Sequence, residues 1–390
     1  MNNIVKNDAQ YLAQTYRRFP LELVKGKGSL CWDNEGKEYI DLGSGIAVNT
    51  FGFCDDYWQK AVIDQLSQLQ HTSNLYYTAP STELAEMLCT RTGMKRVFFG
   101  NSGAEANECA IKVARAYAQS KKGEDCYHII TLNNSFHGRT LTTLAATGQE
   151  VFHTKFLPLT DGFLYADAGD LEAVIKLTEA YPVAAVMVEM VQGEGGVLPL
   201  DKEYVQNLYK FLQEKDILLI VDEVQTGNGR TGTLYAFEQY GFMPDVVTTA
   251  KGLGGGLPIG ACMMGEKAEN VLDAGSHGST FGANPVVCAG ALAVLKQIDD
   301  KLLNEVKEKS AYLFEQFAEA EGIKSVSGLG LMIGLETEKN AADVIAYCRE
   351  HGVLVLSAKN KVRLLPPLNI PMTLLKKAAQ IIKQACSEGL

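Results

Sequence analysis

The 390-residue sequence lacks three features, and each absence excludes a class of protein. No stretch approaches the ~18 consecutive apolar residues of a membrane span, and residues 1–20 contain no apolar core of signal-peptide length. An excess of positive charge is also missing, because the formal net charge is -10, and this argues against a nucleic-acid partner. We therefore expect a cytoplasmic protein that binds neither membranes nor nucleic acid.

Paired cysteines are the third missing feature. The cysteines are odd in number, scattered along the chain and contain no CxxC pair, so we expect neither a disulfide framework nor a bound metal. Buried free thiols in a reducing compartment are the prediction. The nine cysteines are Cys31, Cys54, Cys89, Cys109, Cys126, Cys262, Cys288, Cys348 and Cys386.

Short apolar runs alternate with amphipathic helical patterns through the middle of the chain. Near-continuous apolar strands are typical of a mostly parallel sheet that is buried on both faces. This part is therefore predicted to be an α/β domain of the doubly wound type. The predicted strands are 96–100, 126–132, 183–189, 217–223 and 245–250, and the predicted helices include 106–119, 171–180 and 202–215.

From about residue 284 the pattern changes to two long helical segments, then short strands and a last helix, which predicts a smaller α+β domain. Its expected strands are 330–336, 352–357 and 362–367. The predicted division is 1–50 as an N-terminal segment that packs with the small domain, 51–283 as the large domain and 284–390 as the C-terminal small domain.

Polar residues follow the predicted strands at the point where ligands bind in open α/β sheets. The strand at 96–100 runs into Asn101-Ser102-Gly103-Ala104-Glu105 and then a helix, where small residues let backbone N–H groups approach a phosphate. Taken alone, this run is more simply interpreted as a helix N-cap by Ser102.

The strand at 217–223 ends in Asp222 and Glu223. A carboxylate at the end of a buried apolar strand is costly unless it meets a positive partner, and a protonated ring nitrogen is such a partner. A helix cap or an ion pair with an arginine is the alternative.

Lys251 follows the strand at 245–250 and precedes the glycine-rich run GLGGG. A lysine at which glycines let a ligand come close can have a lowered pKa and form an imine. A surface lysine before a flexible loop is one alternative. A dinucleotide-binding loop is another, although GLGGG precedes no clear helix.

Two arginines are candidates for binding carboxylates. Arg139 lies in SFHGRT and Arg363 lies in VRLLPP. A guanidinium binds a carboxylate through two parallel hydrogen bonds, although either arginine would equally serve in a structural ion pair.

In chain order, NSGAE, SFHGRT, VEMVQGE, VDEVQTGNGRTG, TTAKG and STFGANP resemble the motifs of the class-III, fold-type I pyridoxal-phosphate aminotransferases that act on ω-amino groups. The resemblance extends from about Tyr16 to the last helix, and six ordered motifs are far more specific than any one of them. VKGKGS, GIAVN, HTSNLYYT and VRLLPPL are most similar to the members that act on N-acetylornithine. The family fold has a large, mostly parallel mixed-sheet domain and a smaller α+β domain.

The resemblance implies pyridoxal 5'-phosphate as the cofactor. Lys251 would hold it as a Schiff base and then act as general base and acid, and Asp222 would keep the pyridine nitrogen protonated. The further cofactor contacts that the resemblance implies are Ser102, Gly103 and Ala104 at the phosphate, Phe136 on the ring face, Gln225 near the ring hydroxyl, and Thr280 at the phosphate of the neighbouring subunit. The Thr280 contact implies a homodimer with shared active sites.

The implied reaction transfers the amino group of N-acetylornithine to 2-oxoglutarate, giving N-acetylglutamate semialdehyde and glutamate in arginine biosynthesis. Arg139 would bind the carboxylate far from the reacting amine, and Arg363 would bind the α-carboxylate of glutamate. When the ω-amino substrate is bound, Glu194 would cover Arg363. The remaining substrate contacts are Tyr16, Gly45 and Ser279.

Three places depart from the family pattern. Met190 stands where relatives commonly have proline, and GFCDD at 52–56 replaces a GHCHP-like stretch. Neither touches a role assigned above. Gly45 stands where ornithine aminotransferases have a tyrosine, and a glycine leaves room for an acyl group on the α-nitrogen.

Other hypotheses share part of this pattern. An aminotransferase for ornithine, succinylornithine, 4-aminobutyrate or an acylated lysine would have the same motifs, whereas Glu194 and Gly45 favour N-acetylornithine. A catalytically silent binding protein is disfavoured by the presence of both Lys251 and Asp222. A dinucleotide-dependent oxidoreductase rests on GLGGG alone.

Overall fold

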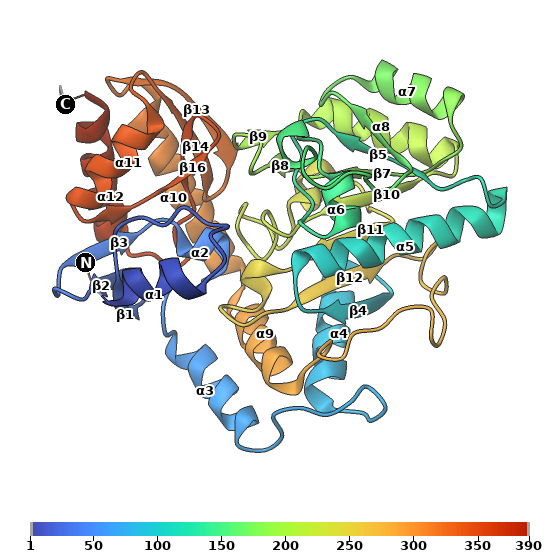
Figure 1. Ribbon diagram of the computed structural model, residues 1–390, viewed down its shortest axis with the longest axis horizontal. Coiled ribbons are helices and arrows are strands. Elements are labelled where there is room, and N and C mark those ends of the chain that lie inside the picture. Colours follow the sequence, from blue (N-terminus) through green and yellow to red (C-terminus); the bar gives the residue numbers. More distant parts are fainter. Residues whose placement is uncertain (1–2, 388–390) are drawn as a thin grey trace.

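A seven-stranded sheet forms the centre of the larger part of the molecule (Figure 1). The computed structural model describes residues 3–387, and in this range the strand order of the large sheet is β4-β12-β11-β10-β7-β5-β6. Its strands are β4 (Arg96–Gly100), β5 (His128–Leu132), β6 (Phe163–Ala166), β7 (Val183–Val188), β10 (Leu218–Asp222), β11 (Val246–Thr249) and β12 (Gly260–Met264). The predicted mostly parallel α/β sheet is confirmed, although strand β12 is antiparallel to both its neighbours. Strands β6 and β12 were not among the predicted strands.

Helices cover both faces of this sheet. Ala185 and Met187 of β7 belong to an apolar cluster with α5 (Gly103–Lys122), whereas the alternating Val186 and Val188 belong to a cluster with α8 (Lys202–Glu214). Successive side chains of a strand point to opposite faces, so the run is apolar throughout. The other helices of this part are α3 (Asp56–Leu66), α4 (Ala79–Thr92), α6 (Leu141–Ala146), η1 (Glu150–Phe152), α7 (Leu171–Ala180), η2 (Ala236–Tyr240) and η3 (Lys251–Leu253).

The N-terminal and C-terminal parts of the chain lie side by side next to the large sheet (Figure 1). Strand β15 (Val353–Leu354) pairs with β3 (Glu38–Asp41) in the sheet β1-β2-β3-β15. A second sheet has the order β13-β14-β17-β16. The remaining elements are α1 (Asn3–Tyr11), β1 (Leu23–Lys27), β2 (Leu30–Asp33), α2 (Ser44–Ala47), β8 (Val191–Gln192), β9 (Leu198–Pro199), α9 (Pro285–Gln297), α10 (Asp300–Ala318), β13 (Ile323–Leu329), β14 (Met332–Thr337), α11 (Ala341–Glu350), β16 (Leu356–Ala358), β17 (Lys361–Leu364) and α12 (Met372–Ser387).

Helix α9 connects the two parts, because it packs against α3 and α4 while α10, which follows it, contacts β13 and α12. We retain the three-part division at residues 50 and 283 as a proposal. The pairing of β3 with β15 supports the grouping of the N-terminal segment with the small domain, whereas the contacts of α9 with α3 and α4 favour a later start of the small domain, after α9.

The cysteines are free, but not all of them are buried. Cys54 is exposed, so the prediction of buried thiols is wrong there, and Cys89 is only half-buried. Cys54 lies in the turn before α3, with a φ of 50°, and this turn lies at the surface. Within residues 3–387, no helix has both the length and the apolar character needed to cross a membrane.

Candidate active site

A cavity of about 460 Å³ lies where the carboxyl ends of several central strands meet. Such an edge is the usual ligand site of an open α/β sheet. The cavity brings together most of the cofactor residues expected from the sequence and one of the expected substrate arginines. These are Ser102, Gly103, Ala104, Phe136, Arg139, Asp222, Gln225 and Lys251.

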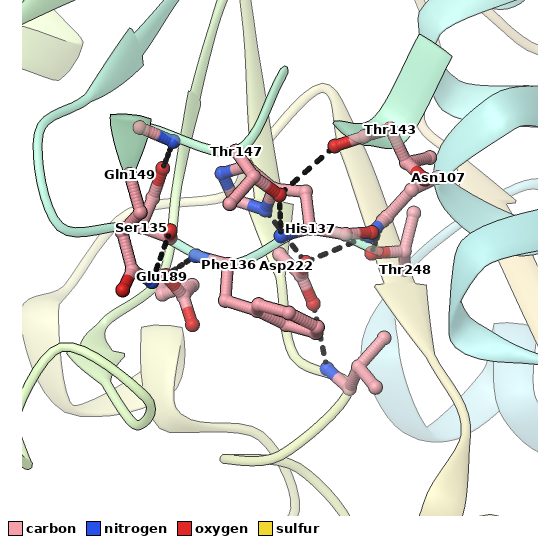
Figure 2. A network of polar contacts seen from close by, with 12 residues as sticks. Asn107, Ser135, Phe136, His137, Thr143, Thr147, Gln149, Glu189, Asp222 and Thr248 are labelled. Carbon is pink, nitrogen blue, oxygen red and sulfur yellow. Dashed lines mark hydrogen bonds and ion pairs between the residues drawn. The ribbon is translucent and has the colours of Figure 1, made fainter. Parts of the chain in front are cut away.

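Asp222, the last residue of β10, is buried and fully hydrogen-bonded (Figure 2). Asn107 Nδ2 and His137 Nδ1 each lie 2.8 Å from Asp222 Oδ2, and the backbone N–H of Val224 donates to Oδ1 at 3.0 Å. The Thr248 hydroxyl donates to Asn107 Oδ1 at 2.7 Å and so fixes that amide. The alternative of an arginine partner is wrong, because the described contacts of Asp222 come from Asn107, His137 and a backbone N–H.

His137 and Asn107 were not predicted as site residues. Burial disfavours the protonated imidazole, but the hydrogen bond and charge of Asp222, together with the charge of Glu189, outweigh burial and raise the pKa of His137. A protonated His137 donates to Asp222 from Nδ1, and its buried Nε2 has no partner among the described residues. The contacts of His137 and Asn107 therefore hold the Asp222 carboxylate in one orientation.

Glu189 is a second buried carboxyl group in the cavity wall that the sequence analysis did not single out. It follows β7 and accepts a hydrogen bond from the Phe136 backbone N–H at 3.0 Å. Burial raises its pKa to about 8, against the opposing charge of His137. The signal that identified Asp222, a carboxylate at the end of a buried strand, was available for Glu189 as well.

Lys251 is half-buried at the start of η3 and has a φ of 45°. Burial lowers the pKa of its amine, and the charges of Glu194 and Asp222 oppose this effect. The next residue is fixed from the N-terminal segment, since the Thr50 hydroxyl donates to the Gly252 carbonyl at 2.7 Å. A lowered pKa increases the share of the neutral amine, which is the form that attacks a carbonyl carbon.

The start of α5 is open to an anion. The Ser102 hydroxyl accepts from the Glu105 N–H at 3.2 Å, so the interpretation of Ser102 as an N-cap is confirmed. A Cβ on Gly103 would lie 2.7 Å from the Val224 side chain, and one on Gly260 would lie 2.0 Å from the Ser102 carbonyl. Glycine at both positions thus lets β12, the helix start and Val224 approach closely, at the positive end of a twenty-residue helix.

Arg363 lies in β17, and its guanidinium is buried against residues of the large domain. Its Nη1 lies 2.5 Å from Glu194 Oε1 and 3.1 Å from Gln225 Oε1. Burial opposes ionisation of Glu194, but the charge and hydrogen bond of Arg363 outweigh burial and lower the pKa of that carboxyl. The predicted pairing of Glu194 with Arg363 is thus present in the structure.

Arg139 differs from Arg363 in its exposure and in its contacts. It is exposed, and its guanidinium carbon lies 5.5 Å from the ring centre of Phe136 and 4.7 Å from that of Phe152. Stacking on two aromatic rings orients the guanidinium while its N–H groups remain available to a carboxylate.

Six predicted residues do not line the 460 Å³ cavity: Glu194 and Arg363, which are described above, and four others. Tyr16 is 73% exposed, and Gly45 lines a separate cavity of about 380 Å³. Ser279 and Thr280 line a third cavity of about 680 Å³. Asn101, which lines the main cavity, donates to Ser279 Oγ at 3.0 Å and joins the two. The substrate role of Tyr16 and the inter-subunit role of Thr280 stay predictions.

Gly45 lies in a left-handed turn. Residues 44–47 have φ values of 47°, 61°, 62° and 62°. This conformation is unfavourable for the three residues of the turn that are not glycine. The buried Asp41 carboxylate stabilises the turn by accepting from the Gly43 and Ser44 N–H groups. A Cβ on Gly45 would make ordinary contact with Val48, which lines the main cavity. Glycine is therefore favoured at residue 45 by the backbone, whereas a Cβ alone would fit in the space beside it.

The fold is that of an α/β enzyme, and its cavity is lined by both a lysine of lowered pKa and a buried carboxylate. A sequence model of the class-III aminotransferases matches residues 11–386, and the chain belongs to this family. It is 51% identical to the acetylornithine aminotransferase of Haemophilus ducreyi, over 99% of each chain.

Solved structures agree on the fold. The ornithine aminotransferase of Toxoplasma gondii, which shows partial occupancy of PLP at its active site, matches with a TM-score of 0.93 and 32% identity over 98% of this chain and 93% of that one. The N-acetylornithine aminotransferase of Stenotrophomonas maltophilia matches with a TM-score of 0.84 and 35% identity over 98% of each chain. The backbone fold is thus similar to that of enzymes for both substrates, and only side chains can distinguish between them.

Proposed function

We propose that this chain transfers the ω-amino group of N-acetylornithine to 2-oxoglutarate, as a cytoplasmic enzyme of arginine biosynthesis with pyridoxal phosphate in the 460 Å³ cavity. The observation that carries the proposal is the meeting of Lys251, Asp222 and the start of α5 in one cavity. The 51% identity to an acetylornithine aminotransferase over the full length supports the choice of substrate.

The residues of the cavity fit this cofactor. The start of α5, with Ser102, Gly103 and Ala104, suits a phosphate dianion, and Asp222 suits a protonated ring nitrogen. Phe136 and Val224 both line the cavity and would contact the faces of a flat ring, with Gln225 at its hydroxyl group. Lys251 supplies the amine for covalent attachment.

Pyridoxal phosphate, when bound, withdraws electrons from the substrate carbon that bears the amine. The Lys251 amine takes the proton from that carbon and delivers it to the cofactor. Its lowered pKa suits a group that must both accept and donate a proton. His137 and Asn107 hold the Asp222 carboxylate in a fixed position, so this group need not reorganise during proton transfer.

The two arginines account for two unlike substrates. Arg139 is available to the carboxylate far from the reacting amine of either substrate, because only aromatic rings contact its guanidinium in the interactions described above. Arg363 is neutralised by Glu194 when the ω-amino substrate is bound, and Glu194 must move aside for the α-carboxylate of glutamate. We assign Glu194 as the switch between the two half-reactions.

We also propose a homodimer in which Thr280 serves the site of the partner. Within the described residues Thr280 lines the 680 Å³ cavity rather than the one with Lys251. Large apolar side chains next to residues of this cavity are exposed: Leu75, Tyr76 and Tyr77 follow Asn74 in the chain, and Phe281 follows Thr280. Exposed apolar groups of this size are typical of a protein interface.

A substrate panel tests the proposed reaction. With 2-oxoglutarate as acceptor, we expect N-acetylornithine to give the highest kcat/KM among acetylornithine, ornithine, succinylornithine, 4-aminobutyrate and acetyl-lysine. Ornithine is the second candidate, because the Toxoplasma gondii ornithine aminotransferase has the TM-score of 0.93. A higher kcat/KM for ornithine would refute the substrate assignment but leave the aminotransferase intact.

Mixed dimers test the assignment of Thr280. Thr280→Ala and Lys251→Ala subunits, when combined, should form heterodimers in which one site carries both defects and the other carries neither. Activity above that of the Thr280→Ala parent is then expected. No gain in confirmed heterodimers would show that Thr280 acts within its own subunit.

A further inference from the structure

Arg230 is a buried cation outside the 460 Å³ cavity, in the loop that follows β10. The residue is 2% exposed, and burial lowers the pKa of its guanidinium to about 9. The hydrogen bonds described for its guanidinium go to two backbone carbonyls, those of Leu331 at 3.1 Å and Pro366 at 2.5 Å. A buried charge is costly, so its retention here calls for a reason.

The two carbonyls belong to the ends of two paired strands. Strands β14 and β17 are antiparallel, with Ile333 opposite Leu364 and Gly334 opposite Arg363. Continuing this register by two residues places Leu331 opposite Pro366. Proline has no N–H to donate to the Leu331 carbonyl, and Arg230 donates to that carbonyl instead. The guanidinium thus closes the pair of strands at the point where the ladder ends.

The same point of contact also holds the small domain against the large one. The Leu331 N–H donates to the Arg230 carbonyl at 2.9 Å. A Cβ on Gly330 would lie 2.5 Å from that same carbonyl, which shows how closely the two backbones approach. Arg363 lies three residues before Pro366, at a distance of about 10 Å along an extended strand.

We propose that Arg230 is a positioning residue for Arg363. By holding the ends of β14 and β17 against the loop of the large domain, it sets where the Arg363 guanidinium meets Glu194, Gln225 and the α-carboxylate of glutamate. The inference rests on the role of Arg363 in the proposed function.

Lys309 provides a matched control. It is also a buried cation that donates to a carbonyl of the same segment, that of Leu368 at 2.8 Å. Its contact lies beyond the strand end and on the side of α10. Loss of this contact should destabilise the segment without displacing Arg363.

The test uses the holoenzyme and measures the two half-reactions separately by stopped-flow absorbance, with glutarate binding and the midpoint of thermal unfolding as further readouts. Arg230→Gln should raise the apparent KM for glutamate about 10- to 100-fold, the range expected when a binding group is displaced by about 1 Å, and should weaken glutarate binding. The acetylornithine half-reaction should keep its KM, because its carboxylate is bound by Arg139 and not by Arg363.

Two further variants are the controls. Arg230→Lys should recover part of the loss, and Lys309→Gln should lower thermal stability with no preference for either half-reaction.

Equal losses in both half-reactions of Arg230→Gln, or an unchanged KM for glutamate, would overturn the positioning role. If Arg230→Gln does not fold, Arg230→Lys decides by the same criterion. Arg363→Ala is the reference. If it shows no loss specific to glutamate, the assigned role of Arg363 fails and the inference fails with it. If it does and Arg230→Gln does not, only the inference fails.

Discussion

The hydrogen-bond network of Asp222 and the two arginine sites differ in how firmly their charged groups are held. Asp222 and Arg139 line the 460 Å³ cavity, and Arg363 contacts Gln225 of its wall. Asp222 is held by Asn107, His137 and a backbone N–H within one chain, and nothing about it must change during the reaction. The arginine sites differ from each other, because Arg363 is buried and paired with Glu194 while Arg139 is exposed on aromatic rings. In the proposed mechanism, the chemistry common to both substrates therefore depends on fixed groups, and discrimination between the substrates depends on groups that can exchange partners.

The largest effect should come from the fixed groups. Lys251→Ala removes the amine that both attaches the cofactor and transfers the proton, so we expect transamination to fall at least ~1,000-fold. The variant should fold and retain cofactor noncovalently, with loss of the visible absorbance band of the attached form. Near-native turnover in this variant would remove Lys251 from the mechanism.

Asp222→Ala should have the next largest effect and should slow both half-reactions about equally, at least ~100-fold, because the lost charge acts in a buried site. It should also weaken cofactor binding. Single-turnover rates with glutamate and with acetylornithine measure this directly. A loss confined to one substrate would contradict the division between fixed and exchanging groups.

Glu194→Ala should affect only one substrate. Arg363 would then face the uncharged part of acetylornithine without a partner, so we expect that half-reaction to slow about 10-fold while the glutamate half-reaction is spared. Stopped-flow absorbance with each substrate alone provides the measurement. Glu194→Asp is the control that keeps the charge, and equal losses for both substrates would rule out the switch.

The smallest effect concerns the acyl group. Gly45→Tyr should weaken acetylornithine binding relative to ornithine by about 1 kcal/mol. Because residue 45 has a φ of 61°, any side chain there is strained, and Gly45→Ala introduces this strain with little added bulk. Selectivity should therefore be compared between the tyrosine and alanine variants. If both shift it equally, the backbone rather than the added bulk is responsible.

The sequence predicted the fixed groups better than the exchanging ones. Asp222 and Lys251 follow apolar strands, and the convergence of parallel strand ends brings them together without knowledge of the loops. Asn107 was part of a predicted helix, and its bond to Asp222 depends on the rotation of that helix about its axis, which no local pattern reports. Strand β12 was missed because Gly260–Met264 follows a glycine-rich run that reads as a loop.

The contacts between domains were the least predictable. The pairing of Arg363 with Glu194 came from the family resemblance, since 169 residues separate the two in the chain. Arg230 gave no signal at all, because GNGRTG is typical of a turn and the carbonyls that its side chain contacts are set by the docking of two domains. Gly45 was interpreted through side-chain space, whereas its positive φ is a second reason for glycine.

Cys54 is the exposed member of the nine cysteines, and this has a practical use. Thiol reagents react with the thiolate, and burial raises the pKa of Cys31, Cys288 and Cys348 to about 12, which leaves them unreactive at neutral pH. A maleimide dye should consequently label the native chain at Cys54 before any other position, without removal of the other cysteines. The label would lie in the 52–56 turn, beside Lys27, which donates to the Cys54 carbonyl at 2.7 Å. Energy transfer between singly labelled subunits of the proposed homodimer would then report subunit exchange in real time.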